Sequence, residues 1–182
     1  MRIILTKGKV AIVDEIDSDL STQSWGAHRD EARAGTAWYA VRRGRMADGC
    51  RTARLHRVIV ERMIGRPLTK QEEVDHINHN GLDNRRANLR VASHQENMWN
   101  RGTHNKNKKS IYRGVTRRGE RDMWRARICI NGKSVHLGDF TSEIDAAKAF
   151  DKAIQRVAGS FSRLNFPENA HVGEIFECQI TQ

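Results

Sequence analysis

The chain has 182 residues, carries a formal net charge of +10 and is polar, with 38% hydrophobic and 30% charged residues. This length fits one domain or two small ones with modest hydrophobic cores. No apolar run is long enough to cross a bilayer, and the first residues, MRIILTKGKV, lack the extended apolar region of a signal peptide. The three cysteines are scattered without a CxxC pair, which argues against a disulfide framework or a four-ligand zinc site. We therefore expect a cytoplasmic protein that needs no membrane.

Short apolar runs dominate the first seventy residues. The runs that we interpret as strands are Ile3–Leu5, Val10–Val13, Ala37–Val41 and Ala53–Leu55. The segment LHRVIVERMIG, residues 55–65, has apolar residues at helical spacing and ends on a glycine, with Pro67 just beyond it. This segment predicts a helix.

The next stretch, EEVDHINHNGLDNRRANLRVASHQENMWN (residues 72–100), is rich in histidine, aspartate and asparagine. VDHIN and LRVAS alternate as short strands, and the loop between them is rich in Asn, Gly and Arg. Ser93 followed by Glu96 is a capping box, which begins a helix. The stretch therefore predicts the order strand, loop, strand, helix.

This order brings together groups with metal and proton chemistry. Asp75 and Asn97 offer oxygen ligands of the kind that Mg²⁺ prefers, and a site with two such ligands leaves room for water and a phosphate. His76 points to the opposite face of a strand from Asp75, and its imidazole can accept a proton near neutral pH. His56 and Arg57 either contact phosphate or serve packing and surface ion pairing. An Asx-rich structural loop with a surface histidine is the competing interpretation of the whole stretch.

Residues 101–110, RGTHNKNKKS, contain no large apolar residue and are interpreted as a basic linker. Lys106, Lys108 and Lys109 of this linker are candidate DNA-binding residues. Ten extended residues span at most about 33–36 Å, which is about one turn of a DNA duplex. The linker therefore predicts that any cut lies near the binding footprint.

A compact unit follows the linker. IYRGVTRR, MWRARICING and KSVHLGDF predict three antiparallel strands, with Asn131-Gly132 as a hairpin turn. TSEIDAAKAFDKAIQRVAG predicts a covering helix. The residues that we assign to its apolar stripe are Ile144, Ala147, Phe150, Ile154 and Val157.

Basic charge concentrates around this sheet, because residues 101–136 hold eleven Lys or Arg and only two acidic residues. Such a field favours a polyanionic partner. In WRARICI, Arg125 and Arg127 alternate with apolar residues, so one sheet face is basic and the other faces the helix. A sheet of this kind can enter the major groove of DNA, where arginine binds guanine and phosphate. A small α+β module with an exposed basic face is the alternative.

The spacing of Asp75-His76, Asn88 and Asn97 resembles that of the HNH (ββα-metal) endonucleases, particularly the phage and intron homing type. The resemblance covers about residues 55–100. It implies that His76 acts as a general base on water, and that Asp75 and Asn97 hold one Mg²⁺ or Mn²⁺ ion against the scissile phosphate and the leaving oxygen. It also implies that Asn88 fixes the loop and orients His76 by backbone hydrogen bonds.

Residues 111–167 resemble the plant Apetala-two / ethylene-response-factor DNA-binding domain in YRGV, WRARI, LGDF, AAKAFDKA and LNFP. The resemblance implies a sheet in the major groove. The positions that match its DNA contacts are Arg113, Thr116, Arg118, Arg125, Arg127, Ser134 and His136. Thr116 and Ser134 stand where plant members usually carry arginine, His136 where they carry tryptophan, and Arg127 where many carry glutamate. We therefore expect DNA binding without the plant recognition sequence, with Arg117 as a substitute contact on the same face.

The sequence as a whole predicts an α+β protein with a ββα-metal nuclease module and a three-stranded antiparallel sheet packed on one helix. The predicted divisions are an HNH domain at 1–100 with its ββα motif at about 72–100, the linker at 101–110, the DNA-binding domain at 111–167 and an uninformative tail at 168–182. The predicted function is that of a homing or phage mobile endonuclease on double-stranded DNA, which uses one Mg²⁺ or Mn²⁺ ion per active site. It nicks as a monomer without a protein partner. The alternatives are a sequence-specific DNA-binding regulator with an inactive HNH module and a protein that binds or cleaves structured RNA.

Overall fold

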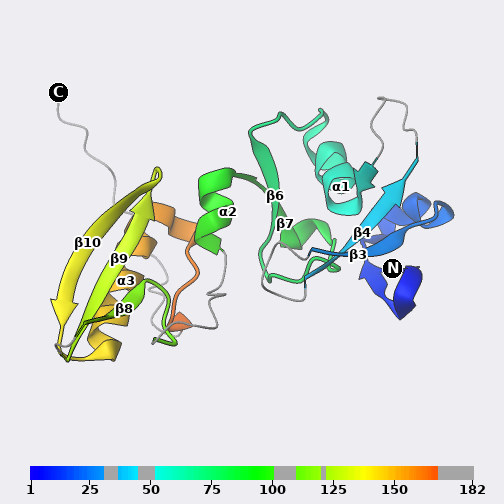
Figure 1. The fold of residues 1–182 in the computed structure, drawn as a ribbon. Coiled ribbons are helices and arrows are strands. Elements are labelled where there is room, and N and C mark those ends of the chain that lie inside the picture. Colours follow the sequence, from blue (N-terminus) through cyan, green and yellow to red (C-terminus); the bar gives the residue numbers. More distant parts are fainter. Residues whose placement is uncertain (31–36, 45–51, 101–109, 120–121, 168–182) are drawn as a thin grey trace, which may run out of the picture. The chain divides into compact units, whose positions relative to one another are not determined.

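The computed structural model describes residues 1–30, 37–44, 52–100, 110–119 and 122–167 (Figure 1). The chain divides into two compact units, Met1–Lys108 (unit 1) and Lys109–Gln182 (unit 2), which both mix helices and strands. Within the described ranges, no helix is long and apolar enough to span a membrane. The predicted DNA-binding residues Lys106, Lys108 and Lys109 lie outside the described residues, as does the tail from residue 168.

The described residues of unit 1 form three small antiparallel sheets. β1 (Arg2–Ile4) pairs with β2 (Val10–Ile12), and β4 (Trp38–Arg43) lies between β3 (Gly26–Arg29) and β5 (Thr52–Arg54). The four strands predicted here match β1, β2, β4 and β5 to within a few residues. β3 was not predicted, because its sequence GAHR buries a single residue, Ala27, and shows no apolar alternation.

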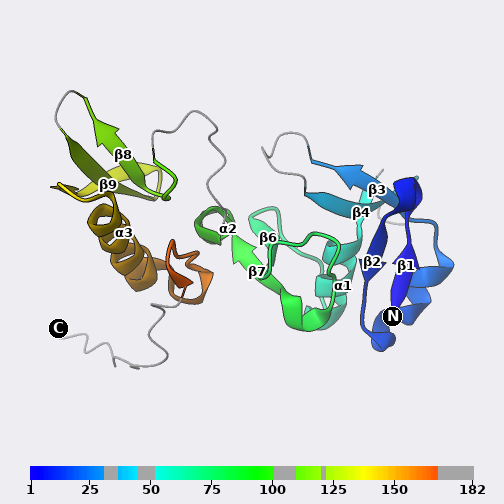
Figure 2. The same ribbon diagram turned by 90° about the horizontal axis from the view of Figure 1, so that it is seen from below.

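The helix α1 (Leu55–Ile64) forms where it was predicted and ends at Gly65, whose φ of 69° is left-handed. Its buried side chains Leu55, Ile59 and Val60 join the core of unit 1. α1 packs against β4 and against the pair of β6 (Glu72–His76) and β7 (Leu89–Ser93), as Figures 1 and 2 show. Its first turn therefore lies close to the segment that carries the predicted catalytic residues.

The predicted order strand, loop, strand, helix is observed over residues 72–100. β6 and β7 are antiparallel, and α2 (His94–Asn100) follows β7 directly. The capping box forms as predicted: the Ser93 N–H donates to Glu96 Oε2 at 2.7 Å, and the Glu96 N–H donates to Ser93 Oγ at 3.3 Å. The hydrogen bond from the Ser93 backbone is the main reason why the pKa of Glu96 is lowered.

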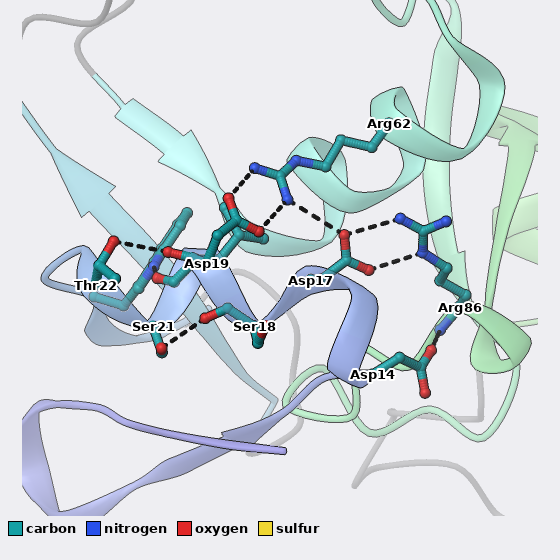
Figure 3. A network of polar contacts seen from close by, with 10 residues as sticks. Asp14, Asp17, Ser18, Asp19, Ser21, Thr22, Arg62 and Arg86 are labelled. Carbon is teal, nitrogen blue, oxygen red and sulfur yellow. Dashed lines mark hydrogen bonds and ion pairs between the residues drawn. The ribbon is translucent and has the colours of Figure 1, made fainter.

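A buried carboxylate joins the beginning of the chain to this region (Figure 3). Asp17, in the 3-10 segment η2 (Glu15–Thr22), is 0% exposed. It accepts hydrogen bonds from Arg86 Nε at 2.8 Å and Nη2 at 2.9 Å, and from Arg62 Nη1 of α1 at 3.4 Å. Asp14 Oδ2 accepts the Arg86 backbone N–H at 2.7 Å. The N-terminal segment thus anchors the loop between β6 and β7.

Unit 2 is a three-stranded antiparallel sheet with one helix across one face (Figure 1). The strand order is β10-β9-β8, made of β8 (Val115–Arg118), β9 (Met123–Ile130) and β10 (Lys133–Phe140). Asn131 and Gly132 both have positive φ, 50° and 75°, as expected for the predicted hairpin turn. The short segment η4 (Gly159–Phe161) follows the helix.

The helix α3 (Glu143–Ala158) begins at Ser142, whose Oγ accepts the Asp145 N–H at 3.3 Å. Two members of its predicted apolar stripe are wrong, since Ile144 is 47% and Val157 is 43% exposed. The residues that α3 buries are Ala146, Ala147, Phe150, Asp151, Ile154 and Ala158. Small alanines let the helix approach the sheet closely, so the contact stripe is centred on them and not on the larger flanking residues.

Candidate active site and nucleic-acid interface

Asn88 holds the loop between β6 and β7 in place. Its Nδ2 donates to Asp83 O at 2.7 Å and to Asn78 Oδ1 at 3.0 Å, while its Oδ1 accepts the Asn78 N–H at 3.0 Å. Its backbone carbonyl accepts the N–H of Ile77 at 3.0 Å. These contacts fit the loop-fixing role that the resemblance implies.

Asp83 is the charged centre of the same loop. Its carboxylate accepts from Arg85 Nε at 2.8 Å and Nη2 at 2.7 Å, and from Asn78 Nδ2 at 2.8 Å. The hydrogen bonds from Arg85 are the main cause that lowers the pKa of Asp83 to about 2. The loop therefore keeps an ionised carboxylate at any pH at which a histidine base can work.

His76 packs into a cluster of rings on the face of β6 opposite to Asp75, as expected for neighbours on a strand. Its ring centroid lies 5.1 Å from that of His56 on α1 and 5.9 Å from that of Tyr39 on β4. The His76 Nε2 lies 3.4 Å from Asn84 Oδ1. His76 is only 7% exposed, so the ring is held by its surroundings before any substrate arrives. Asn84 was missed from the sequence, because nothing in its Asn-rich loop distinguishes it from its neighbours.

Asp75 and Asn97 each contact a different partner. Asp75 Oδ2 forms an ion pair with Arg90 at 2.8 Å, and both Asp75 oxygens accept from Asn100 Nδ2 at 2.9 Å. Asn97 donates through Nδ2 to Glu73. The predicted sharing of one ion by Asp75 and Asn97 therefore stays a prediction, and this structure shows no direct contact between them.

Strand and helix periodicity explain these pairs. Glu73 and Asp75 are two residues apart on β6 and share one face, while Asn97 and Asn100 are three apart on α2 and share another. The register opposes Arg90 to Asp75 across the β6–β7 ladder. Sequence spacing alone could have indicated Glu73 and Asn100 as members of the site, whereas Arg90 required the strand register.

The donor chemistry of this region fits a hard divalent cation. Glu73 and Asp75 supply carboxylate oxygens, and Asn97 donates through Nδ2, which leaves its Oδ1 as a possible ligand. Within the described part of the chain, no group of three or more His, Cys, Asp or Glu side chains forms a ready metal cluster. Carboxylate and amide oxygens are the ligand types that Mg²⁺ binds.

A pocket of about 200 Å³ opens beside these donors. Its lining combines Arg54 and Arg57, which are cationic, with the oxygen-bearing side chains of Glu73 and Asn97. The other lining residues are Tyr39, His56 and Val74. Tyr39 and His56 also contact the His76 ring, so the pocket and the ring cluster share a wall.

In unit 2, the register places most of the predicted DNA contacts on one exposed sheet face. Directly opposed pairs share a face, and the opposed pairs here are Thr116 with Arg125, Arg127 with His136, and Cys129 with Ser134. Arg118, two residues after Thr116 on β8, points the same way. These residues form the face that we call the basic face.

Two predicted contacts lie elsewhere. Arg117 is opposed to Trp124, stacks on its ring at 6.0 Å and pairs with Asp122, so the expectation that it shares the basic face is wrong. Arg113 stacks on the Phe150 ring at 5.4 Å, and burial lowers its pKa to about 10. The Arg113 side chain therefore packs on the core of unit 2. Its role in DNA binding stays a prediction.

Comparison with known proteins finds a family model and several relatives that match parts of this chain. An HNH endonuclease family model matches residues 53–99, which run from β5 to α2. An uncharacterized HNH endonuclease of Acanthamoeba polyphaga mimivirus is 31% identical over 111 residues, which are 61% of this chain and 56% of that protein. Protein 3.8 of Escherichia phage T7 is 37% identical over 67 residues, 37% of this chain and 54% of the phage protein.

A third relative is of another kind. An AP2-like ethylene-responsive transcription factor of Arabidopsis thaliana is 41% identical over 64 residues, which are 34% of this chain and 13% of the plant protein. The chain thus spans little more than half of its viral relatives and a small part of the plant factor. No solved structure matches the chain significantly. The match over residues 53–99, together with the viral relatives, shows that this chain carries an HNH endonuclease domain.

Proposed function

We propose that unit 1 is a metal-dependent endonuclease on double-stranded DNA and that unit 2 supplies affinity and site choice through an Apetala-two-like sheet, as in homing or phage mobile endonucleases. One observation carries the proposal. Inside the region that matches the HNH model, a pocket joins two arginines to a carboxylate and a carboxamide beside a restrained histidine.

The pocket has the chemistry of a site for a backbone phosphate. Arg54 and Arg57 would neutralise the phosphate charge, since arginine pairs with phosphate oxygens through a planar fork of donors. Arg57 is already restrained by donating to the Glu72 carbonyl at 3.3 Å. Binding there would place the phosphate next to the oxygens of Glu73 and Asn97.

His76 is the residue that we assign as general base. A histidine side chain that is held in place can take a proton from an attacking water. The ring is restrained by Asn84 at Nε2 and by the His56 and Tyr39 rings, which also line the pocket. Asn88 would act indirectly, by fixing the loop that follows His76.

We assign one Mg²⁺ or Mn²⁺ ion to Asp75 and Asn97, with Glu73 as a further oxygen donor. Such an ion, when bound, stabilises negative charge on the phosphate and on the leaving oxygen. Asp75 would then exchange a contact with Arg90 or Asn100 for the ion. A single site per chain fits nicking by a monomer, in agreement with the ββα-metal class.

A DNA-binding regulator with an inactive HNH domain is the second candidate. It is favoured by two observations: both Asp75 oxygens accept hydrogen bonds from Asn100, and His76 is buried. The predicted metal ligand is therefore engaged by another residue, and the predicted base has little access to solvent. The two functions differ in one measurable respect, which is cleavage of DNA.

The test uses supercoiled plasmid that contains the DNA flanking the gene, incubated with the full chain and Mg²⁺ or Mn²⁺. We expect nicking with either ion, none with EDTA, and a rate for His76→Ala that is lower by about 10²–10⁴-fold. The affinity for DNA should stay unchanged in a gel-shift assay. His28→Ala is the matched control, since His28 is exposed on β3. Binding without cleavage in the wild type would instead support the regulator.

A further inference from the structure

An acidic side chain, Asp139, lies on the basic face of unit 2. A register shift between His136 and Gly138 places it there: His136 opposes Arg127, but Asp139, three residues later, opposes Arg125. Strict alternation would have turned residue 139 toward the helix. The side chain of Asp139 is only 16% exposed, in contrast to the open residues around it.

Asp139 holds two of the candidate DNA-binding arginines at once. Its Oδ1 accepts from Arg125 Nε at 2.8 Å, and its Oδ2 accepts from Arg125 Nη2 at 3.1 Å and from Arg118 Nη1. His136 Nε2 lies 3.9 Å from Oδ1. The hydrogen bonds from Arg125 are the main cause that lowers the pKa of Asp139 to about 2, so the carboxylate is ionised whenever DNA binds.

This contact restrains Arg125 but leaves some of its N–H donors available. A guanidinium has five N–H donors, and Asp139 takes two of those of Arg125. An arginine that is already ordered loses less conformational entropy when it binds the two acceptors of a guanine edge. Contacts to phosphate are available on every duplex and carry no sequence information.

We propose that Asp139 is a specificity-determining residue, which fixes Arg125 and Arg118 for contacts to base edges and weakens binding to DNA of the wrong sequence. This inference depends on the proposed DNA binding by unit 2. A carboxylate among arginines repels the phosphates of every duplex. The ordered arginines make favourable contacts only with a duplex whose bases match them. Specificity gained in this way combines an attractive and a repulsive element.

The test compares Asp139→Asn with the wild-type full chain in EDTA, so that binding is measured without cleavage. A preferred duplex is first selected with the wild type from a randomised pool, and its dissociation constant is measured beside that of a scrambled duplex at one salt concentration. We expect Asp139→Asn to bind the scrambled duplex more tightly and the preferred duplex more weakly. The ratio of the two constants should fall by about tenfold, the discrimination expected of one bidentate arginine contact.

Asp122→Asn is the matched control. Asp122 is 88% exposed and pairs with Arg117 on the other face of the sheet, so its substitution removes the same charge without releasing Arg125. We expect both duplexes to respond equally to this change, which leaves their ratio unaltered. A second variant, Arg125→Lys, keeps the positive charge but loses the fork, and it should reduce the ratio as Asp139→Asn does.

An unchanged ratio in Asp139→Asn or in Arg125→Lys, with thermal unfolding like that of the wild type, would overturn the inference while DNA binding by unit 2 stands. A wild type that enriches no sequence would contradict both the inference and the recognition role of unit 2. Nicking by unit 1 is not affected by either result, so the two proposals fail separately.

Discussion

The two units place their polar side chains in opposite ways. Among the described residues, unit 1 buries a large polar set: Asp17, His56, Asp75, His76, Asp83, Asn84, Asn88, Asn97 and Asn100. In the described part of unit 2, the buried polar residues are Ser110 and Asp151, and the arginines of β9 alternate with apolar residues on a sheet face that the helix leaves open. This contrast agrees with the proposed functions, since catalytic groups are fixed before a substrate binds, whereas a face that contacts DNA stays open until the duplex arrives.

The same contrast predicts two different origins of stability. Unit 1 combines a hydrophobic core with the buried carboxylate of Asp17, which pairs with Arg86. Unit 2 depends on close packing of small residues, such as Gly114, Ala126, Ala146 and Ala147, against its sheet and helix. A substitution that removes one of these stabilising features should therefore lower the stability of one unit only.

The largest effect is expected from Asp17→Ala. Removing the carboxylate leaves Arg86 and Arg62 without their buried counter-ion, which should lower the free energy of unfolding of unit 1 by about 3 kcal/mol. Urea denaturation gives the magnitude. Amide hydrogen exchange should become faster in residues 1–100, and its rate should not change in β8 to α3. Asp19→Ala, which removes an exposed partner of Arg62, should change little; an equal loss in both variants would contradict the compensation.

A somewhat smaller effect is expected from Gly114→Ala in unit 2. Gly114 has a φ of 75°, and a Cβ there would lie 1.9 Å from a ring carbon of Phe150. Strain and overpacking together should cost about 2–3 kcal/mol, read from thermal unfolding of unit 2. Gly132→Ala is the control, since Gly132 has the same φ but open space around it. If both variants lose the same stability, packing against Phe150 is not the cause.

The smallest effect concerns the metal. Asp75→Asn and Glu73→Gln should each weaken Mn²⁺ binding by about tenfold, because each removes a negatively charged oxygen donor. The affinity is measured by titration with Mn²⁺ followed by electron paramagnetic resonance. Asp139→Asn in unit 2 should leave Mn²⁺ affinity unchanged. A loss in Glu73→Gln but not in Asp75→Asn would move the metal from Asp75 to the carboxylate that lines the pocket.

Local patterns in the sequence carried much of the fold. The spacing in residues 55–65 predicted α1, the Ser93 and Glu96 pair predicted the start of α2, and Asn131-Gly132 predicted the hairpin of unit 2. Each of these signals is complete within a few residues, so no tertiary information is needed to interpret it.

Several features that the sequence did not show depended on contacts between distant segments. Which side of α3 is buried was decided by a sheet that admits alanines, and the partners of Asp75 were decided by the β6–β7 register and by the length of α2. The bulge after His136, which brings Asp139 onto the basic face, leaves no mark in the alternation of KSVHLGDF. Arg117 was misplaced although alternation along β8 alone sets it on the other face from Thr116 and Arg118.

The contacts of Asp14 and Asp17 have a consequence for how this protein can be dissected. The family match begins at residue 53, yet two arginines within it, Arg62 and Arg86, have their shared counter-ion thirty-six or more positions before that boundary. The first β strands also pair with the same loop, through Ile12 with Leu82 and Asn84. A fragment limited to the matched region would lack Ile12, Asp14 and Asp17, so we expect a stable fragment of unit 1 to include the segment that carries these residues.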